Sequence, residues 1–117
     1  MSSAKSQVLE HNIAIRPYQI GEEAQIVDFL NLCYGQWGTL AKWEGLYPQY
    51  PTFDKDSVFI IEENGEIVGH RGLHFRNLVV RHRDNIPTAT LGDTAIHPLY
   101  RSLGLYARLH EVTLRVA

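Results

Sequence analysis

The sequence predicts an α+β domain with a central, largely antiparallel sheet flanked by helices. Two apolar runs flank Asn64-Gly65, a pair typical of a type I′ hairpin turn. Segment 88–98 follows as a further strand with no long helix between, so three consecutive strands are expected to pair antiparallel. Helical patterns precede the hairpin and follow the last strand, which predicts helices outside the sheet.

The first two elements are a short strand and a helix. Segment 12–18 alternates up to Pro17 and predicts a strand that stops there. Segment 21–35 predicts a helix, because Glu22 and Glu23 favour its positive N-terminal end and Gly35 is a common C-terminal cap. Its expected apolar stripe consists of Ile26, Phe29, Leu30 and Cys33.

Segment 36–53 is rich in aromatic residues, glycine and proline. It predicts one or two helical turns around Leu40–Leu46, and Pro48 and Pro51 prevent anything longer. Two interpretations of its aromatic residues stay open, a lid packed over the edge of the core or a wall of a substrate site. These residues are Trp37, Trp43, Tyr47 and Tyr50.

The second half of the chain predicts strands and a final helix. Segment 57–75 is the hairpin, with a bend or bulge expected at Gly69 and Gly72. Segment 81–87 predicts a polar turn before the strand 88–98. In the last helix the apolar face is Leu105, Leu109, Val112 and Val116, and the opposite face is Arg108, Glu111 and Arg115.

Composition excludes several classes of protein. The net charge of −2 gives no general basic field for nucleic acid. A single cysteine, Cys33, excludes an internal disulfide and fits a reducing compartment. Apolar runs fall short of the roughly 18 residues of a membrane helix, and the start lacks a signal-peptide core. We therefore expect a cytoplasmic protein with a flexible N-terminus at 1–11 and one domain at 12–117.

Basic residues are concentrated in segment 70–83, which contains seven histidines and arginines and no acid. They are His70, Arg71, His74, Arg76, Arg81, His82 and Arg83. The segment is interpreted either as a solvated strand face and loop or as a patch for an anionic ligand. His70 and His74 have no confident third ligand, so no metal site is predicted.

The strongest functional pattern lies where the last strand meets the last helix. Pairing through the backbone N–H stops at Pro98, and Arg101 and Gly104 follow before the helix. The first amides of a helix have no internal partner, and a glycine lets a phosphate approach them. The pattern fits a pyrophosphate cradle, or else a helix-start glycine beside a solvated arginine.

Segment 94–109, TAIHPLYRSLGLYARL, resembles the acyl-CoA-binding segment of the GNAT superfamily of N-acetyltransferases. Ile96-His97-Pro98 matches the end of its fourth strand, and 101–106 matches its Arg/Gln-x-x-Gly-x-Gly/Ala loop. The order of elements from about residue 12 is also similar. The sequence departs from the pattern at Tyr106, where the family usually has Gly or Ala.

The resemblance implies an acetyl-CoA-dependent N-acetyltransferase that needs no metal. Its pyrophosphate would lie on the amides of Arg101, Ser102, Leu103, Gly104, Leu105 and Tyr106. Pantetheine would follow Ala95, Ile96 and His97, with an amide near Ile96 polarising the thioester carbonyl. An amine, either a small molecule or a peptide, would attack directly. Asp93 is the candidate base or else a structural acid, and His97 is an alternative acting through water.

The resemblance also implies that the domain is incomplete at its C-terminus, because the family fold continues beyond the helix in which this chain ends. The exposed fourth strand or the last helix is then expected to mediate self-association into a homo-oligomer. Two other functions stay open. A noncatalytic GNAT-like binding or regulatory module is favoured by Tyr106, and an anion or peptide binder would use segment 70–83.

Overall fold

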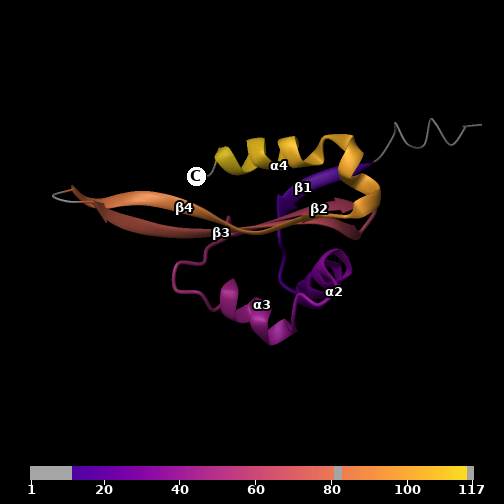
Figure 1. Cartoon of the computed structure of the whole chain (residues 1–117), viewed down its shortest axis with the longest axis horizontal. Coiled ribbons are helices and arrows are strands. Elements are labelled where there is room, and N and C mark those ends of the chain that lie inside the picture. Colours follow the sequence, from indigo (N-terminus) through magenta and orange to yellow (C-terminus); the bar gives the residue numbers. More distant parts are fainter. Residues whose placement is uncertain (1–11, 81–82, 116–117) are drawn as a thin grey trace, which may run out of the picture.

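The computed structural model describes residues 12–80 and 83–115, with side chains described outside 76–89. Four antiparallel strands form one sheet in the order β1-β2-β3-β4. Helices α2 and α3 lie on one face of the sheet and α4 on the other (Figure 1). The elements are β1 (Ile13–Pro17), α2 (Glu23–Tyr34), α3 (Leu40–Leu46), β2 (Val58–Glu63), β3 (Glu66–Val80), β4 (Arg83–Ile96), the 3-10 helix η1 (Pro98–Leu103) and α4 (Leu105–Leu114). The predicted α+β fold class is confirmed.

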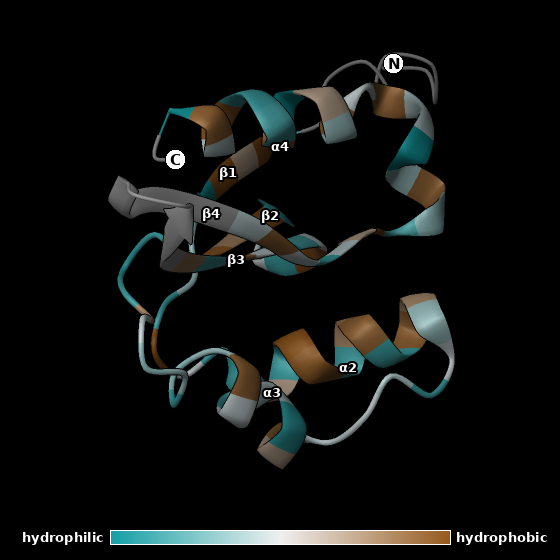
Figure 2. Cartoon of the chain, turned by 60° about the vertical axis from the view of Figure 1, so that its left-hand side comes forward, coloured by the Kyte–Doolittle hydropathy of each residue, from teal (hydrophilic) through white to brown (hydrophobic). Residues whose placement is uncertain are grey.

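The sheet separates two hydrophobic cores, one under each helical layer. Figure 2 shows α2 and α3 on one side of the sheet and α4 on the other. The α2–α3 core consists of Ile26, Val27, Phe29, Leu30, Trp37, Trp43, Tyr47, Val58, Ile60 and Ala95. The α4 core consists of Phe59, Ile61, Val68, Leu73, Ile96, Leu105 and Leu109. Alternate residues of β2 therefore enter opposite cores, as a strand covered on both faces requires.

The helices form where their patterns predict them. Gly35 ends α2 with a φ of 86°, and Thr39 caps α3 by accepting a hydrogen bond from the Lys42 amide at 3.2 Å. In α4 the predicted stripe is buried at Leu105 and Leu109. Further along, Thr113 is buried as well, and the predicted stripe residue Val116 lies outside the described residues.

The β2–β3 hairpin confirms the predicted turn, because Asn64 and Gly65 have φ values of 52° and 87°. Pairing shifts between Ile61 and Glu62, opposite the stretch of β3 that contains Gly69. A second shift follows Arg71, where β4 carries one residue more than β3. The predicted irregularities near Gly69 and Gly72 are thereby confirmed.

The predicted polar turn at 81–87 is wrong, because β4 begins at Arg83 and pairs Pro87 with Asn77. A proline is tolerated there since β4 is the edge strand of the sheet in this chain. Pairing of β2 with β3 ends at Val58 and Gly72, so the rest of β3 and β4 continues as a two-stranded ribbon (Figure 1).

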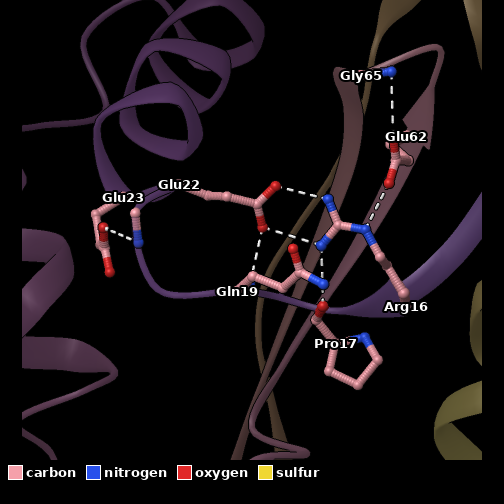
Figure 3. Close-up of polar contacts among 8 residues, drawn as sticks. Arg16, Pro17, Gln19, Glu22, Glu23, Glu62 and Gly65 are labelled. Carbon is pink, nitrogen blue, oxygen red and sulfur yellow. Dashed lines mark hydrogen bonds and ion pairs between the residues drawn. The ribbon is translucent and has the colours of Figure 1, made fainter.

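An ion-pair network joins the first strand, the second strand and the start of α2 (Figure 3). The Arg16 guanidinium donates from Nε to Glu62 at 2.5 Å and from Nη2 to Glu22 at 2.6 Å. The Arg16 bond lowers the pKa of Glu22, and Glu22 in turn raises the pKa of Arg16. Glu22 therefore fixes α2 against β1 by a side-chain ion pair, and it does not cap the helix amides.

Candidate functional site

A cavity of about 350 Å³ lies against the edge of β4 near its C-terminal end. It brings together the end of α2, the last residues of β4, η1 and the first turn of α4. Its lining residues are Cys33, Tyr34, Thr94, Ala95, Ile96, Arg101 and Tyr106. Four predicted cofactor residues, namely Ala95, Ile96, Arg101 and Tyr106, thus meet at one cavity.

The backbone of β4 presents alternating groups to this cavity. The His97 amide donates to the Val68 carbonyl at 2.8 Å, so it is committed to the sheet. In an antiparallel ladder every second pair is hydrogen-bonded. The pair Ala95–His70 therefore faces inward, and the backbone groups of Thr94 and Ile96 face the open edge.

Both outward carbonyls of this stretch accept hydrogen bonds from side chains. The Tyr34 hydroxyl donates to the Thr94 carbonyl at 2.5 Å, and Arg101 Nε donates to the Ile96 carbonyl at 2.9 Å. The Ile96 amide lies between them and points to the open side. Sequence reasoning missed Tyr34, because nothing local in a helix C-terminus signals a contact 60 residues away.

The predicted phosphate loop is a 3-10 helix followed directly by α4. The His97 ring caps it, because Nδ1 accepts a hydrogen bond from the Leu99 amide at 3.1 Å. Gly104 has a φ of 71° between the two helices, and no atom lies within 4 Å of the place a Cβ would take. Open space therefore lies beside Gly104 at the start of α4, where the phosphate is predicted.

The remaining loop residues present mainly their backbone. Ser102 is exposed, Leu103 packs against the α4 core, and the Leu105 side chain is fully buried. Tyr106 is 57% exposed, and its ring covers the Arg71 guanidinium at 5.2 Å from the ring centroid. The bulky residue at the sixth loop position thus packs on a buried cation.

The Asp93 carboxylate is held by two aromatic side chains. Oδ1 accepts from Trp37 Nε1 at 3.1 Å, and Oδ2 accepts from the Tyr47 hydroxyl at 2.8 Å. The Asp93 amide donates to the same Tyr47 oxygen at 3.0 Å. Burial raises the pKa of Tyr47, which keeps its hydroxyl a donor. Gly72 leaves room for the Tyr47 ring, since a Cβ there would lie 2.2 Å from it.

His70 extends this network into the α2–α3 core. Trp43 Nε1 can only donate, and it lies 3.2 Å from His70 Nε2. The proton of the neutral ring is therefore on Nδ1, which donates to the Asp93 carbonyl at 2.9 Å. Burial lowers the pKa of His70 to about 4, so the ring is neutral near pH 7.

These contacts correct the interpretation of segment 70–83 as a basic surface for two of its residues, His70 and Arg71. His70 and Arg71 are both 0% exposed, because this part of β3 is covered on both faces. Arg81 and His82 lie outside the described residues. Among the described residues, no three His, Cys, Asp or Glu side chains gather to hold a metal ion.

The aromatic segment packs mainly as a lid over the core. Trp37, Trp43 and Tyr47 are buried, whereas Tyr50 is 37% exposed. Cys33 packs against the α2–α3 core while lining the cavity, and burial raises the pKa of its thiol. Within the described ranges, no helix has the length and apolar character to cross a membrane.

Comparison with solved structures shows the same fold in several acetyltransferases. An acetyltransferase from Trypanosoma brucei is 16% identical, with 90% of this chain and 74% of that chain covered at a TM-score of 0.67. An aminoglycoside 6′-N-acetyltransferase from Acinetobacter baumannii is 14% identical, with 91% and 71% covered at 0.69. A GNAT family acetyltransferase from Brucella melitensis in complex with acetyl-CoA is 16% identical, with 91% and 68% covered at 0.63.

Comparison at the level of sequence gives a family but no individual relative. No curated protein matches the chain. A family model described as an acetyltransferase (GNAT) domain matches residues 14–116. That match covers nearly the whole of the described structure, including the cavity and the loop beside it. The chain therefore belongs to the GNAT acetyltransferase domain family.

Proposed function

We propose that this chain binds acetyl-CoA along the edge of β4 and acts in acetyl transfer to a primary amine. The observation that carries the proposal is the Ile96 amide, which faces the cavity between two carbonyls already capped by Tyr34 and Arg101. A single outward donor beside open space suits a carbonyl acceptor such as a thioester.

The proposed chemistry is direct attack. The Ile96 amide donates to the thioester oxygen, the amine nitrogen attacks the carbonyl carbon, and the tetrahedral intermediate expels the CoA thiolate. The amine loses a proton, for which Asp93 is the proposed acceptor. Each Asp93 oxygen already accepts one hydrogen bond, and a carboxylate oxygen has a second lone pair for another.

The phosphates belong at the other end of the cavity in this proposal. The first amides of α4 and the open space over Gly104 receive the pyrophosphate. Arg101 adds positive charge there while its Nε stays on the Ile96 carbonyl. The reducing, cytoplasmic location expected from the single Cys33 belongs to the same proposal.

The first experiment is calorimetric titration of acetyl-CoA into the wild-type chain and into Gly104→Val. We expect binding by the wild type and a loss of affinity of about tenfold or more in the variant, because a β-branched side chain fills the space facing the α4 amides. Gly65→Val is the matched control. Gly65 also has a positive φ, 87°, and open space around its missing Cβ, but it lies in the β2–β3 turn.

Wild-type affinity in both Gly104→Val and Gly65→Val would contradict a cradle at α4. Equal losses in both would show that backbone strain, rather than the loop, weakens binding. Absence of acetyl-CoA binding by the wild type would contradict the proposed function as a whole.

A noncatalytic GNAT-like binding module is the second candidate. It is favoured by Asp93, whose two oxygens are both held by donors from the aromatic lid. Turnover of acetyl-CoA with any amine would exclude it. Self-association through the edge of β4 or through α4 remains part of our proposal, and sedimentation velocity at micromolar concentrations distinguishes a monomer from an oligomer.

A further inference from the structure

Arg71 is a fully buried cation between the sheet and α4. It is 0% exposed and lies in β3 opposite Thr94 of β4. Its Nε donates to Thr94 Oγ1 at 3.3 Å, and its Nη1 donates to Thr113 Oγ1 at 3.1 Å. Nη1 also lies 3.2 Å from His110 Nδ1, which must accept because arginine only donates.

The partners of Arg71 among the described residues are neutral groups. Two hydroxyls, one imidazole nitrogen and the ring of Tyr106 contact the guanidinium, and within the described side chains none of its hydrogen bonds goes to a carboxylate. Nη2 is buried and has no hydrogen-bond partner. A buried charge without an opposite charge, and a buried donor without an acceptor, are both unfavourable. An added anionic acceptor at Nη2 would supply both a hydrogen-bond partner and an opposite charge.

The geometry of the guanidinium indicates where that acceptor enters. Nη2 lies trans to Cδ in the planar group, on the edge that it shares with the Nε–H. Nε reaches Thr94, which lines the 350 Å³ cavity. The Nε–Nη2 edge of Arg71 is therefore buried behind Thr94 and Tyr106, which line the cavity, and such an edge matches a carboxylate in a bidentate pair.

We propose that Arg71 is the binding residue for a carboxylate carried by one of the two substrates. This inference rests on the proposed function. The carboxylate enters between Thr94 and Tyr106, and Tyr106 can turn aside because its ring is 57% exposed. The carboxylate then replaces Thr94 as the acceptor for Nε and accepts a second hydrogen bond from Nη2.

The position along β4 fits a short dicarboxylic acyl group. The thioester is assigned to the Ile96 amide, and Thr94 is two residues away, roughly 7 Å along a strand. An extended four-carbon acyl chain spans about 4 Å between its two carbonyl carbons, and a hydrogen bond of about 3 Å from the terminal carboxylate covers the remainder. The same site also suits an amine acceptor that carries a carboxylate, because acceptor and acyl group meet at the thioester. The carboxylate that binds Arg71 can thus belong either to the acyl group or to the amine acceptor.

Calorimetric titrations of the wild-type chain separate the two sources. The first arm compares succinyl-CoA with acetyl-CoA, and unacylated CoA serves as the reference. The second arm compares glycine with glycinamide on protein saturated with CoA. We expect the carboxylate-bearing member of one pair to bind at least about tenfold more tightly, as a charge-assisted pair with a buried arginine provides.

Arg71→Met tests whether Arg71 causes the preference, and Arg108→Met, at an exposed position of α4, is the matched control. The preference should vanish in Arg71→Met with CoA affinity retained, and should persist in Arg108→Met. If Arg71→Met does not fold, the wild-type comparison still decides. CoA binding without discrimination in either pair, or discrimination that survives in Arg71→Met, overturns the inference alone. Failure of CoA itself to bind removes the proposed function as well.

Discussion

His70 and Arg71 are neighbours in β3, both basic and both fully buried, yet they are in opposite situations. His70 enters the α2–α3 side, where each ring nitrogen has one partner and the ring is neutral. Arg71 enters the α4 side, where its described hydrogen-bond partners are two hydroxyls and an imidazole nitrogen and where Nη2 has no acceptor. Burial alone therefore does not tell a structural basic residue from a ligand-binding one, whereas the balance of donors and acceptors does.

The largest effect is expected from a substitution at Gly72 that disrupts the hydrogen-bonded network on the α2–α3 side of the sheet. In Gly72→Ala the new Cβ would lie 2.2 Å from the Tyr47 ring, so the ring must move and release Asp93. We expect the free energy of unfolding to fall by about 4 kcal/mol, combining overpacking with lost hydrogen bonds. Urea unfolding measures it.

Gly45→Ala is the control for this substitution. It adds the same methyl group within α3, where no atom lies within 4 Å of the new Cβ. A gain of up to about 1 kcal/mol is expected there, because alanine favours a helix over glycine. A cost below about 1 kcal/mol for Gly72→Ala would show that Tyr47 is not tightly held.

The second effect is a pH dependence of stability from His70. Its folded pKa of about 4 lies below the ordinary value of 6.5, so the unfolded chain binds more protons between these values. The contribution of His70 to the free energy of unfolding is therefore complete above pH 6.5 and is lost as the pH drops toward 4. The full loss is roughly 3 kcal/mol.

The difference between the wild type and His70→Met isolates this contribution, because other groups titrate in both. Urea unfolding at pH 7, 5.5 and 4.5 should show the stability advantage of the wild type shrinking as the pH falls. An advantage that is constant with pH would mean that His70 titrates normally.

The smallest effect on stability is expected from replacing Arg71, the buried residue on the α4 side whose Nη2 has no acceptor. Arg71→Met replaces an unpaired buried charge by an apolar side chain of similar length, so the free energy of unfolding should change by less than about 1 kcal/mol or rise. His70→Met at pH 7 is the matched comparison and should be clearly less stable, because Trp43 Nε1 and the Asp93 carbonyl lose their partner. Equal losses would erase the contrast between the two residues.

Local chemistry made much of the fold predictable. The hairpin turn follows from Asn64-Gly65, and α3 begins and ends at the predicted residues, Leu40 and Leu46. The turn predicted at 81–87 was wrong because its polar residues and Pro87 favour a loop locally, whereas pairing with β3 continues the strand. Long-range pairing is the information that a local pattern lacks.

The candidate site was predictable where it consists of backbone and less so where it depends on side-chain surroundings. Gly104 and Arg101 mark the loop by type and spacing. The burial of Arg71 could not be predicted, because a single sequence does not show that α4 covers that face of β3. Thr113 and Tyr34 carry no local signal for their partners, since Arg71 and the Thr94 carbonyl are distant in sequence.

The outward amide of Ile96 also bears on how such a site changes over generations. Any side chain except proline leaves that N–H in place, provided that the strand keeps its course. The same holds for the amides at the start of α4. Most side chains along the cavity can therefore change during evolution while the backbone amides keep their contacts. Selection then acts on the path of the main chain. Residues such as Arg71 are then free to adapt one inherited groove to different ligands.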